Sequence, residues 1–163
     1  AGIVGPTPAK FIRKKNIEML MRINFEVPVL LTGSILLSKK LMDHSSIVFM
    51  STIATQMPYF GGALYNSAKS AIESYSKTLA LELVKKGIRA NCLSPGLVNT
   101  PLIKKPVSEG QMELMTESLE RYIKKYPMGM GESEDIANAI VFFLSDESRW
   151  ISGTNLLMGG VVQ

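Results

Sequence analysis

The sequence is poor in the residues on which thiol and metal chemistry depend. Among 163 residues it has one cysteine, Cys92, and one histidine, His44. A single cysteine excludes a disulfide within the chain and is typical of a reducing compartment, so we expect a cytoplasmic protein. Because His44 has no second histidine or thiol nearby in the sequence, we expect no metal site.

Long apolar runs and strongly charged tracts are also missing. No uninterrupted apolar run reaches the roughly 18 residues of a membrane span, so we expect no membrane partner. The net charge of +4 is carried largely by lysine pairs, several of them where we expect helices to end, without interleaved aromatic residues. We therefore predict no nucleic-acid partner. The pairs are Lys39-Lys40, Lys85-Lys86, Lys104-Lys105 and Lys124-Lys125.

The composition that remains is that of one ordinary folded domain. Hydrophobic residues make up 46% and charged residues 20% of the chain. A chain of this size can bury roughly 70% of its unfolded surface, which suffices for a hydrophobic core. We therefore treat residues 1–163 as a single domain.

Short apolar segments alternate with longer helical patterns along the chain. This order is typical of an α/β domain with a parallel sheet. Ser133 is the predicted capping hydroxyl of the last helix, and Lys85-Lys86-Gly87 is a predicted helix stop. The predicted strands are Ile47–Met50, Ile88–Leu93 and Asn155–Met158. The predicted helices are Asn16–Leu41, Gly62–Lys86, Ser108–Lys125 and Ser133–Leu144.

Tyr65 and Lys69 are the residue pair best suited to chemistry. Four residues apart on a helix, they share a face. A tyrosine has an ordinary pKa of about 10, and a nearby cation lowers it, so the pair suits proton transfer to a carbonyl. The preceding strand ends at Ser51-Thr52 and the following one at Ser94-Pro95-Gly96. In open α/β sheets both ends lie at the edge where ligands bind.

Taken together, these motifs resemble the short-chain dehydrogenase/reductase family along essentially the whole chain. The residues that carry the resemblance are Ala1-Gly2, Arg22-Ile23-Asn24-Phe25, Tyr65-x-x-x-Lys69, Pro95-Gly96 with Thr100, Gly131 to Ala137, and Ser152-Gly153-Thr154 to Gly159-Gly160. The resemblance implies a Rossmann-type, doubly wound parallel sheet. It also implies an oxidoreductase that interconverts a ketone and a secondary alcohol with NAD or NADP.

The resemblance assigns a role to each matching residue. Tyr65 would be the general acid and base, and Lys69 would lower its pKa and hold the nicotinamide ribose. Asn24 would anchor a relay water. Thr52 stands where the family usually has serine, with Ser51 as the alternative hydroxyl. Only one of the two should face the substrate, because neighbouring strand residues point to opposite faces. The implied cofactor-binding residues are Ala1, Gly2, Ser51, Tyr65, Lys69, Pro95, Gly96, Val98 and Thr100.

Pro28 adds an argument that is independent of the resemblance. Proline has no N–H, so the carbonyl of Asn24 receives no helical hydrogen bond from position 28. A free carbonyl inside a helix needs a partner, and water is suited to that place. A relay water at Asn24 and a simple packing kink are both compatible with this pattern.

One motif of the family is absent. The sequence has no Thr-Gly-x-x-x-Gly-x-Gly turn, and it begins at Ala1 rather than at methionine. We expect the first βαβ half of the fold to precede Ala1, so that this chain is part of a longer reading frame. The alternative is a catalytically silent fragment or oligomerisation module.

The resemblance also bears on substrate and partners. The closing segments resemble the 3-oxoacyl-[acyl-carrier-protein] reductases, and sugar, polyol and steroid substrates stay open. Family members pair through two long helices, here 16–41 and 62–86, so we expect a homodimer or homotetramer.

Overall fold

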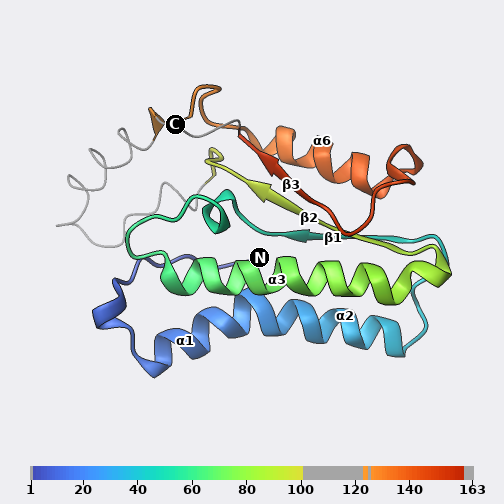
Figure 1. The fold of residues 1–163 in the computed structure, drawn as a ribbon, viewed down its shortest axis with the longest axis horizontal. Helices are drawn as coiled ribbons and strands as arrows, with labels where there is room; N and C mark the ends of the chain where they lie inside the picture. The colour runs from blue at the N-terminus through green and yellow to red at the C-terminus, as the bar shows by residue number, and fades with distance from the viewer. Residues whose placement is uncertain (1, 101–122, 125, 160–163) are drawn as a thin grey trace.

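A parallel sheet lies between two helical layers. The structure, a computed structural model, describes residues 2–100, 123–124 and 126–159. Helix α3 and the helix that contains α1 and α2 lie on one side of the sheet, and α6 lies on the other (Figure 1). The predicted α/β class with a parallel sheet is confirmed.

The sheet consists of three strands in the order β1-β2-β3. Their bounds are β1 Ser46–Met50, β2 Arg89–Pro95 and β3 Asn155–Met158, so all three predicted strands are confirmed. Phe49 of β1 lies opposite Cys92 of β2, which in turn lies opposite Asn155 of β3. Because every pair is parallel, the carboxyl ends of the strands meet at one edge of the sheet.

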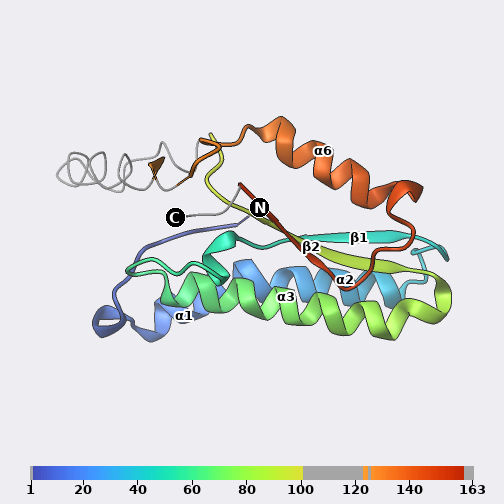
Figure 2. The same ribbon diagram turned by 45° about the horizontal axis from the view of Figure 1, so that its top comes forward.

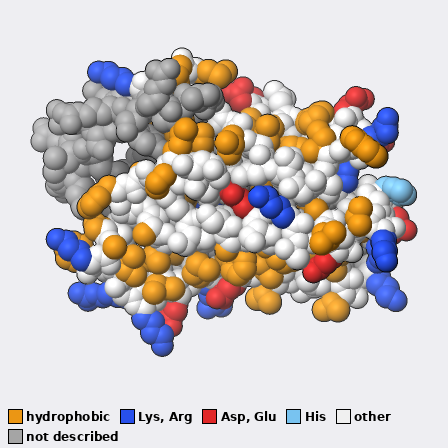
Figure 3. Space-filling model, viewed as in Figure 1, with side chains coloured by type: hydrophobic (Ala, Val, Ile, Leu, Met, Phe, Trp, Pro, Cys, Tyr) orange, Lys and Arg blue, Asp and Glu red, His pale blue; other side chains and the backbone are white. Residues whose placement is uncertain are grey.

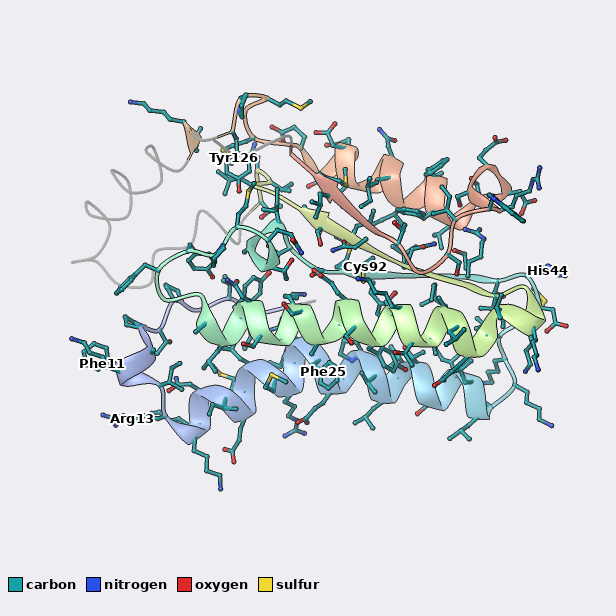
Figure 4. The ribbon with its side chains drawn as sticks, viewed as in Figure 1. Phe11, Arg13, Phe25, His44, Cys92 and Tyr126 are labelled. Atoms are coloured by element: carbon teal, nitrogen blue, oxygen red, sulfur yellow. The ribbon has the colours of Figure 1, made fainter. Side chains whose placement is uncertain are left out.

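Helix α3 (Ala63–Leu83) supplies most of the core on its side of the sheet. Ile72 and Leu79 pack against Phe49 and Cys92, and Figure 4 shows Cys92 between α3 and the sheet. A 3-10 turn, η4 (Val84–Lys86), continues the helix to Gly87, which has the left-handed φ of 67°. The predicted glycine stop is therefore confirmed.

The first helix is continuous from Lys14 to Leu37 but changes its geometry midway. It consists of α1 (Lys14–Met21), a π-helical turn, η2 (Arg22–Glu26), and α2 (Val27–Leu37). The N–H of Val27 bonds the Arg22 carbonyl, five residues back. The wide turn lies directly before Pro28, whose missing N–H leaves the helix free to widen there.

The helix also ends earlier than predicted. Its last residue is Leu37 rather than Leu41. Lys39 adopts φ of 53°, which turns the chain away from the helical path. Figure 2 shows α2 and α3 side by side beneath the sheet, and Phe25 packs against the core from this first helix.

By length and composition alone, the helix Lys14–Leu37 could cross a membrane, with a mean hydropathy of 1.4. Neither Arg22 nor Glu26, which lie at its middle, would be favourable in a hydrocarbon core. Leu20 and Thr32 are buried on its inner side. Leu30, Leu31 and Leu37 of the same helix are exposed.

On the other face of the sheet lies α6 (Ser133–Leu144), with the predicted bounds. The predicted cap was wrong, because Glu132 rather than Ser133 is the N-cap residue. The backbone N–H of Glu132 donates to Asp135 Oδ2 at 2.7 Å, so a carboxylate closes the first turn. The helix predicted at Ser108–Lys125 falls largely outside the described residues.

The carboxyl end of α6 is closed by a buried guanidinium. Arg89 of β2 is 7% exposed, and its Nη1 donates to the Phe143 carbonyl at 2.9 Å and to Ser148 Oγ at 2.7 Å. Its Nη2 donates to the Ser145 carbonyl at 3.0 Å. The cation therefore satisfies carbonyls at the negative end of the helix dipole and ties α6 to the sheet.

Replacing Arg89 should destabilise the fold. We expect Arg89→Met to lower the free energy of unfolding by about 3 kcal/mol, because it leaves buried carbonyls without their charged donor. Urea unfolding followed by circular dichroism measures the loss. Arg149→Met, the same change at an exposed neighbour, should change stability by less than about 0.5 kcal/mol. Equal losses in both variants would contradict the assignment.

Candidate active site

Four segments meet near the carboxyl edge of the sheet. The first turns of α3 carry Tyr65 and Lys69, and β1 leads into Thr52. The π turn of the first helix carries Asn24, and the chain before that helix passes beside it at Gly2. The fold thus brings together residues from positions 2 to 69 of the sequence, at the end of the sheet where the N-terminal segment also lies (Figure 1).

Thr52 faces Tyr65. It is the N-cap of the short turn η3 (Ile53–Thr55), and its Oγ1 accepts the N–H of Ala54 at 3.3 Å. A hydrogen bond joins the Thr52 hydroxyl to the Tyr65 side chain. Because Oγ1 already accepts from the backbone, its single proton is available for the phenol oxygen.

Ser51 also faces α3, where it contacts Glu73 rather than Tyr65; β1 ends at Met50, before this pair, so the expected alternation of strand residues does not apply to it. Ser51 is 6% exposed, and its Oγ donates to the carboxylate of Glu73 on α3. Of the two hydroxyls weighed from the sequence, Thr52 lies beside the tyrosine and Ser51 lies in the core.

Lys69 lies behind Tyr65 and is 7% exposed. Its Nζ donates to the Met50 carbonyl at 2.9 Å and lies 5.8 Å from the centre of the Tyr65 ring. Burial lowers the pKa of Lys69, and the field of Cys92 opposes that effect.

The protonation of Tyr65 differs from the sequence-based expectation. Burial raises the pKa of the Tyr65 phenol above its ordinary 10.0, and the hydrogen bond from Thr52 lowers it in part. Lys69 was expected to lower this pKa. At 5.8 Å from the ring, and bonded to Met50, it does not offset the cost of desolvating a phenolate.

Asn24 holds the N-terminal segment against the site. Its Nδ2 donates to the Ile3 carbonyl at 2.9 Å, and its Oδ1 accepts the Ile3 N–H at 3.2 Å. A Cβ at Gly2 would lie 3.2 Å from Asn24 Oδ1 and 3.9 Å from Lys69 Nζ. From the sequence we considered the backbone carbonyl of Asn24 and did not predict these two side-chain hydrogen bonds to Ile3. A hydrogen bond from a side-chain amide to a backbone segment 21 residues away leaves no local sequence pattern.

The segment that follows β2 also lies at the carboxyl edge of the sheet. Gly96 donates its N–H to the Met158 carbonyl at 2.8 Å, and a Cβ there would lie 2.6 Å from Tyr126 Cε1. Val98 bridges to Gly131. Pro95 ends β2, and Thr100 is half-buried a few residues beyond it. Ala1, also predicted to bind cofactor, lies outside the described residues.

The described residues fit one end of a nicotinamide dinucleotide. Lys69 gives one of its three N–H donors to Met50, and Gly2 leaves room beside the ammonium for a ribose hydroxyl. The sequence holds no glycine-rich turn to cradle the pyrophosphate. Within the described ranges, no group of three or more His, Cys, Asp or Glu side chains is placed to bind a metal.

Comparison with known proteins agrees with this geometry. A family model described as enoyl-(acyl carrier protein) reductase matches residues 1–161. The human dehydrogenase/reductase SDR family member 4 is 34% identical over 144 residues, 88% of this chain and 50% of that protein. The 3-oxoacyl-[acyl-carrier-protein] reductase of Buchnera aphidicola is 28% identical over 161 residues, 98% of this chain and 63% of that protein.

Solved structures of the same kind share the fold. A 4-hydroxyisoleucine dehydrogenase mutant complexed with NADH and succinate superposes with a TM-score of 0.82 at 25% identity, covering 98% of this chain and 65% of that one. The chain thus spans about half to two thirds of the length of the proteins it matches. The fold, the motifs and the family match together establish that this chain belongs to the short-chain dehydrogenase/reductase family.

Proposed function

We propose that the protein interconverts a ketone and a secondary alcohol by hydride transfer with NAD or NADP. The observation that carries the proposal is the placement of Tyr65 beside the Thr52 hydroxyl, with Lys69 buried behind the phenol. This arrangement can hold a carbonyl oxygen between two hydroxyls and give it a proton.

Each residue has a part in the proposed reaction. When bound, the nicotinamide supplies the hydride in reduction and accepts it in oxidation. Tyr65 donates its phenolic proton to the carbonyl oxygen in reduction, and Thr52 orients that oxygen. Lys69 holds the ribose and stabilises the phenolate that forms. Asn24 keeps the Gly2–Ile3 segment beside Lys69.

The proposed substrate is a small carbonyl compound or the matching secondary alcohol. The Buchnera relative is by name a 3-oxoacyl-[acyl-carrier-protein] reductase, which supports a 3-oxoacyl thioester as the first compound to test. A catalytically silent module is the competing proposal.

Replacing Tyr65 should abolish turnover without unfolding the protein. In the full-length polypeptide that includes this chain, we expect Tyr65→Phe to lower kcat for ketone reduction by about 10³-fold, because the general acid is lost. Absorbance of NADH or NADPH at 340 nm follows the reaction. Tyr75→Phe is the matched control on the same helix and should retain activity.

Calorimetric titration of that polypeptide with both cofactors separates the two proposals. Saturable binding together with an inactive Tyr65→Phe variant supports the oxidoreductase. Absence of binding to either cofactor would favour the silent module.

The phenol of Tyr65 should titrate above 10 in this chain. Burial is the larger influence on its pKa, so the proton-donating form persists throughout the neutral range. Carbon-13 NMR of ζ-labelled tyrosine measures the pKa, and Tyr65→Phe assigns the signal. Thr52→Ala should raise the pKa further, since it removes a hydrogen bond that favours the phenolate. A value below 10 would mean that Lys69 outweighs burial.

For a partner, we propose a second copy of this chain. Apolar side chains gather on the face that α1 and α2 present to solvent, along the lower edge of Figure 3. Leu30 is 68% and Leu31 59% exposed, and Leu81 of α3 is 75% exposed. A contiguous apolar surface of this kind is typical of protein interfaces. It supports pairing through the two long helices.

A charge on this face should separate the copies. We expect Leu30→Glu to convert the assembly to monomers, because pairing would bury a carboxylate without a partner. Light scattering coupled to size-exclusion chromatography measures the mass. Leu144→Glu makes the same change on α6, across the sheet, and should leave pairing through α2 intact. A monomeric parent protein would contradict the proposal.

A further inference from the structure

Glu73 is a buried carboxylate for which the reaction proposed above has no use. It lies on α3 one turn after Lys69 and is 9% exposed. A carboxylate in the core is costly unless hydrogen bonds replace its water. Its partners therefore indicate what it does.

Three hydroxyls converge on one oxygen of this carboxylate. Ser51 Oγ donates to Glu73 Oε1, and Thr55 Oγ1 lies 2.9 Å from the same atom. Ser94 Oγ lies 3.3 Å from it, but its shorter hydrogen bond is to Asn155 Oδ1 at 2.8 Å. Ser51 follows β1, Thr55 ends the turn η3, and Ser94 lies near the end of β2. The Glu73 side chain thus links the end of β1 and the turn η3 to the helix that bears Tyr65.

Two of these hydroxyls enclose Thr52. Ser51 precedes it directly, and the Thr55 N–H donates to the Thr52 carbonyl at 3.2 Å. The single Thr55 hydroxyl proton lies between two acceptors, the Thr52 carbonyl at 3.0 Å and Glu73 Oε1 at 2.9 Å from Oγ1. Between these points Thr52 has little freedom, and its hydroxyl meets both Ala54 N–H and the Tyr65 side chain.

We propose that Glu73 is a positioning residue that holds the Thr52 hydroxyl in place against Tyr65. Because both Glu73 and Tyr65 belong to α3, the helix fixes the tyrosine directly and the threonine through the carboxylate. The positions of the two hydroxyls are therefore both set by the same helix. An effect of Glu73 on catalysis rests on the proposed function, but its role in positioning Thr52 does not.

Glu73→Asp tests the geometry, since it keeps the charge and shortens the side chain by one methylene. We expect the pKa of Tyr65, measured by carbon-13 NMR as above, to rise by about half a unit, because Thr52 no longer donates steadily to the phenol. Glu82→Asp, an exposed change on the same helix, should leave this pKa unchanged.

A double-mutant cycle distinguishes positioning from a general loss of stability. In a Thr52→Ala background, Glu73→Asp should shift the Tyr65 pKa by less than about 0.2 units, because the group it positions is gone. An equal shift with and without Thr52 would overturn the proposal, as would no shift in either background.

Thr55 offers a second route if Glu73→Asp fails to fold. Thr55→Val breaks the link to Glu73 in a similar shape and should raise the Tyr65 pKa in the same direction. Thr55→Ser keeps the hydroxyl and should restore the parent value. If Thr55→Val and Thr55→Ser give the same Tyr65 pKa, the proposal is wrong.

Steady-state kinetics of the full-length protein measure the effect of Glu73 on catalysis. Glu73→Asp should lower kcat by about 3- to 10-fold with KM for the ketone unchanged, the pattern of an interaction made in the transition state. The further loss in a Thr52→Ala background should be less than about twofold. If the parent protein has no turnover, the proposed function fails, while the NMR arm still decides the role of Glu73.

Discussion

The packing of α3 against β1 and β2 is the constraint on which the site depends. Ile72 and Leu79 bury one face of the helix against the sheet. This packing fixes the position of the first turns of α3 relative to the ends of the strands. Tyr65 and Lys69 extend from those turns. A shift of α3 by one turn would move them about 5.4 Å along the sheet, beyond the reach of Thr52. The packing of the core therefore determines the geometry of the site.

The electrostatics of the site follow from the same burial. Lys69 and Glu73 share a face of α3, and each is held by neutral oxygens rather than by the other: a carbonyl for Lys69, and hydroxyls for Glu73. Lys69 has three N–H donors and gives one of them to the Met50 carbonyl. Desolvation raises the pKa of the Tyr65 phenol and keeps it protonated, and Thr52 lowers this pKa in part. A phenol that is kept protonated in this way suits proton donation to a carbonyl oxygen.

Local patterns predicted the parts of the fold that local physics determines. The strand at Asn155–Met158, the helix at Ser133–Leu144 and the stop at Gly87 each follow from a short run of residues. Tyr65 and Lys69 were visible because their spacing matches a helical turn. The hydrogen bonds between Asn24 and Ile3 and the buried carboxylate of Glu73 were not predicted. Both depend on contacts between segments that are far apart in the sequence. The raised pKa of Tyr65 was missed for the same reason, since spacing reveals a neighbouring charge but not the depth of burial.

The π turn at Arg22–Glu26 has a consequence for how this helix can change through evolution. One additional residue in a turn rotates everything beyond it by about 100° relative to an uninterrupted α-helix. The angle between Leu30 or Leu31 and Asn24 therefore differs from that of a regular α-helix by this fixed amount. Asn24 bonds Ile3 from one side of this turn, and the exposed leucines lie beyond it. Restoring the regular repeat by deleting one residue would turn either Asn24 or the outer leucines away from their present directions.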